Sequence, residues 1–216
     1  MKLPDPPLLI VTDRRQARRP LAEIAAMALA VGCRWISLRE KDLPDDEQVL
    51  LARSLLPVAR RYGAFLMVHG EPALAKLSGV DGVHLPAGSD AVAARTLLGR
   101  DKIIGVSIHT SGEAETLDPA VLDYALAGPA FETISKPGYG PEIGRKGLAE
   151  MAGVARVPLL AIGGINTLRI AEIIATGCSG VAVMGGVMRA AEPAQEVRAL
   201  IATLTGSVAS REPRRS

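Results

Sequence analysis

Hydrophobic residues gather into eight short runs along the chain, separated by longer stretches with helical character. The runs are nearly continuous in apolar residues rather than alternating, a pattern typical of parallel strands buried on both faces. The predicted strands are Leu8–Thr12, Trp35–Arg39, Phe65–Val68, Gly82–Leu85, Ile103–Ile108, Tyr124–Ala127, Leu159–Ile162 and Val181–Met184. The predicted helices are Pro20–Ala30, Asp46–Tyr62, Pro72–Leu77, Asp90–Leu98, Ser111–Thr116, Gly147–Ala155, Thr167–Thr176 and Ala194–Leu204.

This alternation of strand and helix indicates an α/β fold with a parallel sheet. Eight such units fit a compact (β/α)8 TIM barrel, a fold that needs about 200 residues or more. The competing architecture, a doubly wound open sheet, usually has a glycine-rich first turn, whereas here the first strand leads into Thr12-Asp13-Arg14-Arg15. We therefore predict a single barrel domain over residues 1–206, followed by a basic, disordered tail over residues 207–216.

Composition and charge exclude several classes of protein. The formal net charge of the 216 residues is +2, and Arg211, Arg214 and Arg215 lie in the tail, so a nucleic-acid partner has little support. The apolar runs are too short to span a membrane. Two cysteines, Cys33 and Cys178, exclude a disulfide framework and a cysteine-based zinc site, which favours a cytoplasmic protein. Because only 3% of residues are aromatic, we expect a core of Ala, Val, Ile and Leu.

Polar residues that carry chemistry follow several of the predicted strands. In a (β/α)8 barrel the reactive groups sit at the C-terminal ends of the strands. All three histidines fall at such ends, as His69, His84 and His109, and the basic group Arg39-Glu40-Lys41 follows the second strand. One histidine there would usually be structural, as we expect for His84, but three at one rim favour a site.

Two glycine pairs follow the last two strands, Gly163-Gly164 and Gly185-Gly186. Without a Cβ atom, their backbone amides can approach a phosphate closely, and the loops after strands seven and eight are the usual phosphate site of this barrel. The loop after the sixth strand adds two hydroxyls and a cation at Thr133, Ser135 and Lys136. We therefore expect a phosphorylated ligand.

Taken in order, these motifs resemble the thiamin phosphate synthase superfamily, which contains the synthase and the TenI-type thiazole tautomerase. The resemblance runs from Leu9 to about Leu204. It implies phosphate binding by Gly163, Gly164, Met184 and Gly185, and substrate binding by Arg39, Lys41, His69, Ser107, Thr133, Ser135 and Lys136. The motifs that carry it are Arg39-Glu40-Lys41, Val80–Leu85, Gly105–Thr110, Gly128-Pro129 with the hydroxyls and lysine after it, and Ala161–Ile165.

Departures from the family pattern bear on which reaction is catalysed. The synthase holds Mg2+ with two aspartates, one from an Asn-Asp-Asp run that is His69-Gly70-Glu71 here. The other aspartate follows the fourth strand in the family. This chain has Pro86–Ser89 there, and its first carboxylate, Asp90, comes one position later than in the family pattern. Mg2+ prefers carboxylate and phosphate oxygens in octahedral geometry, so a synthase would have to use Glu71 and Asp90. The glutamine that usually precedes the basic group is Ser37.

By contrast, Leu85–Ser89 and Phe131-Glu132-Thr133 look like the tautomerase branch. This resemblance implies an isomerase without metal or other cofactor, which moves a proton to aromatise a carboxythiazole phosphate. Its acid and base would be His109, since imidazole titrates near neutral pH. A histidine also occurs there in many synthases, so His109 does not separate the branches.

The first expectation is thus a thiazole phosphate tautomerase of thiamin biosynthesis. The first alternative is thiamin phosphate synthase, which joins hydroxymethylpyrimidine diphosphate to thiazole phosphate and releases diphosphate. A second is a non-catalytic regulatory barrel that binds a thiamin-related phosphate. A Schiff-base aldolase would need a lysine inside the barrel, whereas Lys41 and Lys136 are placed at its rim. The sequence leaves open whether the protein is a homo-oligomer.

Overall fold

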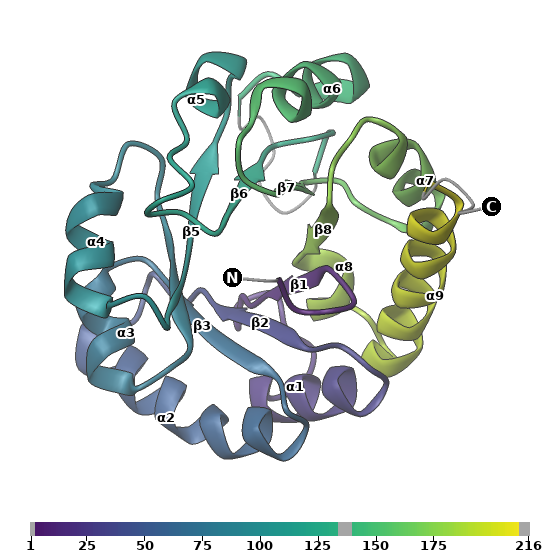
Figure 1. Ribbon diagram of the computed structural model, residues 1–216. Helices are drawn as coiled ribbons and strands as arrows, with labels where there is room; N and C mark the ends of the chain where they lie inside the picture. The colour runs from purple at the N-terminus through teal and green to yellow at the C-terminus, as the bar shows by residue number, and fades with distance from the viewer. Residues whose placement is uncertain (1–2, 134–139, 212–216) are drawn as a thin grey trace.

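A computed structural model describes residues 3–133 and 140–211 of the chain. Eight parallel strands close into a barrel in sequence order, with β1 hydrogen-bonded to β8, and Figure 1 shows the helices around them. The predicted (β/α)8 barrel is therefore confirmed. The strands are β1 Leu8–Val11, β2 Trp35–Leu38, β3 Phe65–His69, β4 Gly82–Leu85, β5 Ile103–Ile108, β6 Tyr124–Ala127, β7 Leu159–Ile162 and β8 Gly180–Val183. The helices are α1 Leu21–Ala30, α2 Asp45–Arg61, α3 Pro72–Ser78, α4 Ala91–Leu98, α5 Ser111–Glu115, α6 Gly144–Val154, α7 Thr167–Ala175, α8 Gly185–Met188 and α9 Pro193–Arg211.

Two helices differ from the sequence prediction. The short helix α8 begins at Gly185, within the second glycine pair, where only a loop was expected. Helix α9 continues to Arg211, five residues beyond the point where the tail was predicted to begin. The remaining tail residues, 212–216, lie outside the described part of the chain.

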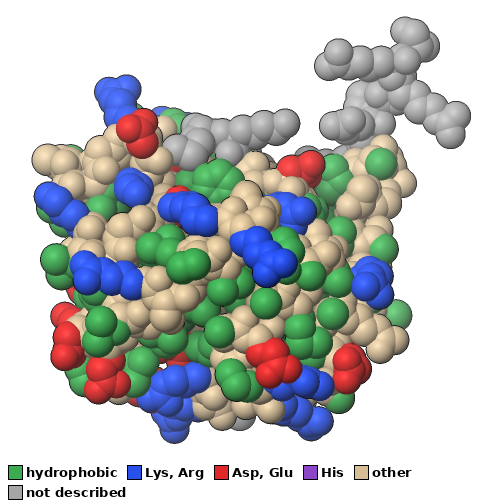
Figure 2. Space-filling view, turned by 90° about the horizontal axis from the view of Figure 1, so that it is seen from below, with side chains coloured by type: hydrophobic (Ala, Val, Ile, Leu, Met, Phe, Trp, Pro, Cys, Tyr) green, Lys and Arg blue, Asp and Glu red, His purple; other side chains and the backbone are tan. Residues whose placement is uncertain are grey.

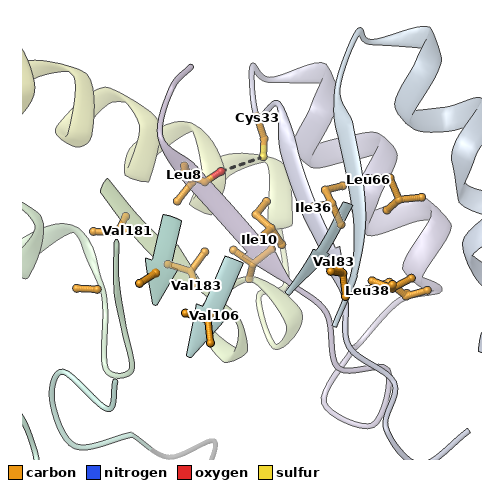
Figure 3. Close-up of a cluster of buried hydrophobic side chains, with 14 of the residues drawn as sticks. Leu8, Ile10, Cys33, Ile36, Leu38, Leu66, Val83, Val106, Val181 and Val183 are labelled. Atoms are coloured by element: carbon orange, nitrogen blue, oxygen red, sulfur yellow. Dashed lines mark hydrogen bonds between the residues drawn. The ribbon is translucent and has the colours of Figure 1, made fainter. Parts of the chain in front are cut away.

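Most of the core lies between the barrel and its helices. Outward-facing residues of the strands, such as Leu8, Ile36 and Val83, are at most 2% exposed and belong to one continuous cluster with the apolar faces of the helices. Figure 3 shows part of this layer, in which the Cys33 thiol donates a hydrogen bond to the Leu8 carbonyl. Its members are almost all aliphatic, as the low aromatic content predicts.

The interior of the barrel is filled differently. Trp35 and Tyr124, both fully buried, meet edge to face with 4.7 Å between ring centroids, and the Trp35 indole donates to the Met67 sulfur at 2.8 Å. Tyr124 fits because β5 has no side chain opposite its ring, since a Cβ atom on Gly105 would lie 2.1 Å from the ring. The expectation of a purely aliphatic core is wrong here, because the few aromatic residues are concentrated where large side chains are needed.

The outer surface carries dispersed charge. On the face in Figure 2, Lys and Arg side chains are spread among apolar ones, with Asp and Glu mainly toward the lower edge. Within the described residues, no helix has both the length and the apolar character needed to cross a membrane.

Candidate active site

A cavity of about 640 Å3 opens where the strands end, at the C-terminal rim of the barrel. Ten of the predicted site residues line it, although they come from separate strand ends and loops. These residues are Arg39, Lys41, His69, Ser107, His109, Thr133, Gly163, Gly164, Met184 and Gly185. Two others, Ser135 and Lys136, lie outside the described residues. The structure thus brings the predicted groups together around one space.

A buried carboxylate fixes the basic group after β2. Glu40 is 1% exposed, and its two oxygens accept hydrogen bonds from the Thr12 hydroxyl at 2.6 Å and the Arg14 amide at 3.0 Å. The Thr12 oxygen accepts in turn from the Arg39 amide at 3.0 Å. Burial raises the pKa of Glu40, and these hydrogen bonds oppose the rise. The backbone after β2 is thus tied to the loop after β1 at both Arg39 and Glu40. This fixes the position from which Arg39 and Lys41 reach the cavity.

Lys41 directly follows Glu40, and its side chain lines the cavity. Partial burial and the neighbouring charge of Arg39 lower its pKa. Two positive charges in sequence suit a ligand with more than one negative charge, such as a diphosphate. Lys41 follows the strand rather than projecting from it into the barrel interior, so it does not satisfy the requirement of a Schiff-base aldolase.

His109 follows β5 at the edge of the cavity. Its Nδ1 atom lies 2.5 Å from the Gly128 carbonyl oxygen, and because a carbonyl only accepts, Nδ1 carries the proton. In the neutral ring Nε2 therefore holds the lone pair, which makes it the basic atom. The Glu113 carboxylate accepts from the His109 amide at 2.6 Å as part of the cap of α5, which fixes the backbone under the ring. This arrangement can remove and return a proton.

His84 has a different environment from the other histidines. It is fully buried and does not line the cavity. Its Nδ1 and Nε2 atoms lie 2.9 Å from the Tyr124 and Ser107 hydroxyl oxygens, respectively. Burial and the charge of Lys41 lower the pKa of His84 to about 3, so its ring is neutral. The structural role expected for His84 agrees with this placement.

Two features of the backbone require glycine at the first pair, Gly163-Gly164. Gly163 and Gly164 have φ angles of +103° and +65°, which residues with a Cβ atom rarely adopt. A Cβ atom on Gly164 would also lie 2.5 Å from the Glu132 carbonyl oxygen. This loop is thus pressed against the segment after β6 while it lines the cavity, and its backbone can contact a phosphate.

Sequence reasoning missed two arginines that line the cavity, Arg169 in α7 and Arg189 after α8. The Arg169 guanidinium lies 4.2 Å from the centre of the Phe131 ring and donates to the Gly164 carbonyl at 3.1 Å. Arg189 donates to the Gln16 side chain. Arg169 could have been found as a cation in the first turn of the helix that follows a glycine pair. Arg189 has no such signal, because its place depends on the unpredicted helix α8.

The residues proposed for Mg2+ in a synthase are not brought into the cavity. Asp90 accepts a hydrogen bond from the Ala93 amide at 2.9 Å and caps α4, while Glu71 stands at the start of α3, and neither lines the cavity. Glu132 is the single carboxylate among the described lining residues, which include no group of three or more potential metal ligands. This donor set does not fit an ion held by two carboxylates.

The barrel and its rim define a class of protein: a (β/α)8 domain with a cavity suited to phosphorylated ligands at the C-terminal ends of its strands. Comparison with known proteins gives the family. Residues 8–187 match the family model described as thiamine monophosphate synthase, and the chain belongs to this family.

Named relatives extend over nearly the whole chain. It is 39% identical over 199 residues to a putative thiamine-phosphate synthase of Geobacter sulfurreducens, covering 91% of this chain and 93% of the relative. It is also 39% identical over 206 residues to a thiamine-phosphate synthase of a Roseiflexus species, covering 94% and 86%. The solved thiamine phosphate pyrophosphorylase of Pyrococcus furiosus superposes with a TM-score of 0.82 at 29% identity, covering 93% and 96%. These names favour the synthase over the tautomerase that the sequence analysis put first.

Proposed function

We propose that the chain is an enzyme of thiamin biosynthesis, with thiamin phosphate synthase as its first candidate reaction. The observation that carries this proposal is the cavity with two separate groups suited to anions, in a chain similar to proteins named as synthases. One group is Arg39 and Lys41 after β2, and the other is the pair of glycine loops after β7 and β8. A synthase takes two phosphorylated substrates, so it needs two such groups.

In this reaction the bond from the pyrimidine methylene carbon to a diphosphate oxygen breaks. A bond from that carbon to the thiazole nitrogen forms. Arg39 and Lys41 stabilise the negative charge on the departing diphosphate, because cations near a leaving group lower the barrier. The backbone of Gly163 and Gly164 holds the phosphate of the thiazole, which orients its nitrogen. Since Glu71 and Asp90 lie away from the cavity, we assign no step to a metal held by them.

A second candidate, the thiazole phosphate tautomerase, is favoured by the state of His109. Its Nδ1 proton is bound to the Gly128 carbonyl, which leaves Nε2 as a base at the cavity edge. The reaction removes a proton from the dihydrothiazole carboxylate phosphate at one atom and returns a proton at another. It needs a base that becomes an acid, and it needs no carboxylate pair.

One set of assays distinguishes the candidates. Purified protein is given hydroxymethylpyrimidine diphosphate and thiazole phosphate over a series of Mg2+ concentrations, and separately the dihydrothiazole carboxylate phosphate with chelator. Thiamin phosphate formation supports the synthase, and aromatisation in chelator supports the tautomerase. Binding of thiazole phosphate by calorimetry without either turnover would overturn both and favour the regulatory barrel.

His109→Asn tests the catalytic assignment. Asparagine keeps a hydrogen-bond donor for Gly128 but cannot take up a proton, so we expect kcat for aromatisation to fall about 100-fold or more. Thr110→Ser, which keeps the capping hydroxyl beside it, is the matched control. Undiminished turnover of the His109→Asn variant would remove His109 from the mechanism.

A further inference from the structure

Three hydrogen-bonded side chains run from the barrel interior to the cavity. The Tyr124 hydroxyl lies 2.9 Å from His84 Nδ1, and His84 Nε2 lies 2.9 Å from Ser107 Oγ. Tyr124 and His84 are fully buried and do not line the cavity, whereas Ser107 does. The resemblance implies that Ser107 binds substrate, but neither proposed reaction gives a role to Tyr124 or His84 behind it.

Tyr124 determines which way these hydrogen bonds run. Within the described part of the chain, His84 Nδ1 is the one hydrogen-bond partner of the buried Tyr124 hydroxyl. If Nδ1 carried a proton, the tyrosine oxygen would accept it, and the hydroxyl proton would be buried without an acceptor. An unsatisfied buried donor is costly. Tyr124 therefore donates to His84 Nδ1.

The direction at Tyr124 sets the direction at Ser107. With Nδ1 as acceptor, the neutral ring carries its proton on Nε2, which donates to the Ser107 oxygen. Protonation of both nitrogens would again leave the Tyr124 proton without an acceptor, and the pKa of His84, lowered to about 3 by burial and by Lys41, agrees with a neutral ring. The Ser107 proton then has no acceptor on His84 and is directed to the cavity.

We infer that Tyr124 and His84 are positioning residues that commit the Ser107 hydroxyl to donate a hydrogen bond to the bound ligand. The ligand atom must be an acceptor, such as a phosphate or carboxylate oxygen or a ring nitrogen with a lone pair. A ligand that offers only an N–H or O–H at this point is disfavoured, because the Ser107 proton would then have no acceptor. The identity of the ligand as a phosphorylated thiazole rests on the proposed function, whereas the direction of the hydrogen bonds does not.

The direction can be measured without any ligand. The chain has three histidines, so 15N NMR of its imidazole rings gives a simple spectrum, in which a His84→Gln variant assigns the His84 signals. We expect a proton on Nε2, an unprotonated Nδ1, and no titration from about pH 5.5 to 8.5. A proton on Nδ1 in the unmodified protein would overturn the inference.

A double-mutant cycle tests the effect on binding, with thiazole phosphate as the probe in calorimetry. We expect Ser107→Ala to raise Kd about tenfold and Tyr124→Phe about threefold, since the phenylalanine no longer fixes the ring. In the Ser107→Ala background, Tyr124→Phe should have no further effect, because its influence passes through Ser107. Tyr62→Phe, at the half-buried end of α2, is the matched control.

A general packing role would give a different result. Tyr124→Phe would then raise Kd by the same factor in both backgrounds, which would overturn the inference. If the unmodified protein does not bind thiazole phosphate at all, the proposed function fails. The ring spectrum still decides the direction of the hydrogen bonds in that case.

Discussion

Glu40 shows at the scale of one residue how a buried charge can position exposed ones. It does not line the cavity, yet it holds Thr12 and the Arg14 amide, and Thr12 holds the backbone of Arg39. A carboxylate accepts two hydrogen bonds in fixed directions, so one buried group orients two loops. The raised pKa of Glu40 is a consequence of this burial, and it makes a prediction about stability.

We predict that Glu40→Gln changes the pH dependence of unfolding. A carboxyl whose pKa is raised on folding binds its proton more tightly in the folded state. Proton binding therefore stabilises the fold fully below the ordinary pKa near 4.5, and this stabilisation is lost as pH rises through the raised pKa. The unfolding free energy of the unmodified protein minus that of the variant should therefore fall as pH rises through this window. Urea unfolding at a series of pH values measures it, with Glu47→Gln on the exposed face of α2 as control. A difference that rises with pH would contradict the prediction.

In the glycine pair after β7, Gly164 is the more tightly packed position. A methyl group there would lie 2.5 Å from the Glu132 carbonyl oxygen and 2.9 Å from the Arg169 guanidinium, at a φ of +65°. We expect Gly164→Ala to push the loop away from the segment after β6 and to weaken thiazole phosphate binding by about tenfold or more, since small displacements of binding groups have large effects. Calorimetry measures this. Gly153→Ala in α6, where a methyl group meets open space, should leave binding unchanged.

At the scale of elements, the Asp90 carboxylate has two possible roles: it can cap helix α4, or it can bind Mg2+ as a synthase would require. As the cap of α4, it accepts a hydrogen bond from the Ala93 amide at 2.9 Å. We expect Asp90→Ala to lower the unfolding free energy by about 1 kcal/mol, the usual cost of losing such a cap. Asp90→Asn should retain most of the stability, because the amide oxygen also accepts.

Neither Asp90 variant should alter turnover or its dependence on Mg2+, since the side chain does not line the cavity. Thermal unfolding and steady-state kinetics together decide the matter. Loss of activity in Asp90→Ala that added Mg2+ restores would show that Asp90 is a metal ligand after all.

At the scale of the whole molecule, regular patterns were predictable and local exceptions were not. Continuous apolar runs gave β4 to β7 with their observed bounds, because strands buried on both faces leave a clear signal. Helix α8 was missed because four residues beginning Gly-Gly carry no helical periodicity. The rule that reactive groups follow the strands, together with the family resemblance, selected ten residues that line one cavity. The same rule could not place Arg189 at the cavity or show that Asp90 lies outside it. The positions of both residues depend on how the loop after a strand leads into the next helix.

Closure of the barrel joins the first strand, β1, to the last, β8, and Gly180 lies at this seam. The Val181 amide donates to the Pro7 carbonyl at 3.1 Å, and β8 pairs with β1 in a register that places Val181 beside Leu8. A Cβ atom on Gly180 would lie 2.2 Å from the Pro7 carbonyl oxygen, which is backbone and cannot rotate away. A methyl group there must therefore separate the first strand from the last.

We expect Gly180→Ala to lower the unfolding free energy by about 1–3 kcal/mol, in the range of overpacked cores. Every strand of a closed barrel has two neighbours, so opening one seam should weaken the whole structure while urea unfolding keeps a single transition. Gly206→Ala in α9, where a methyl group meets open space, should instead raise the unfolding free energy by up to about 1 kcal/mol. Because all eight strands contribute to one rim, the Gly180→Ala variant should also bind thiazole phosphate more weakly. Unchanged stability would show that the seam between β1 and β8 can widen without strain, and that the site does not depend on tight closure.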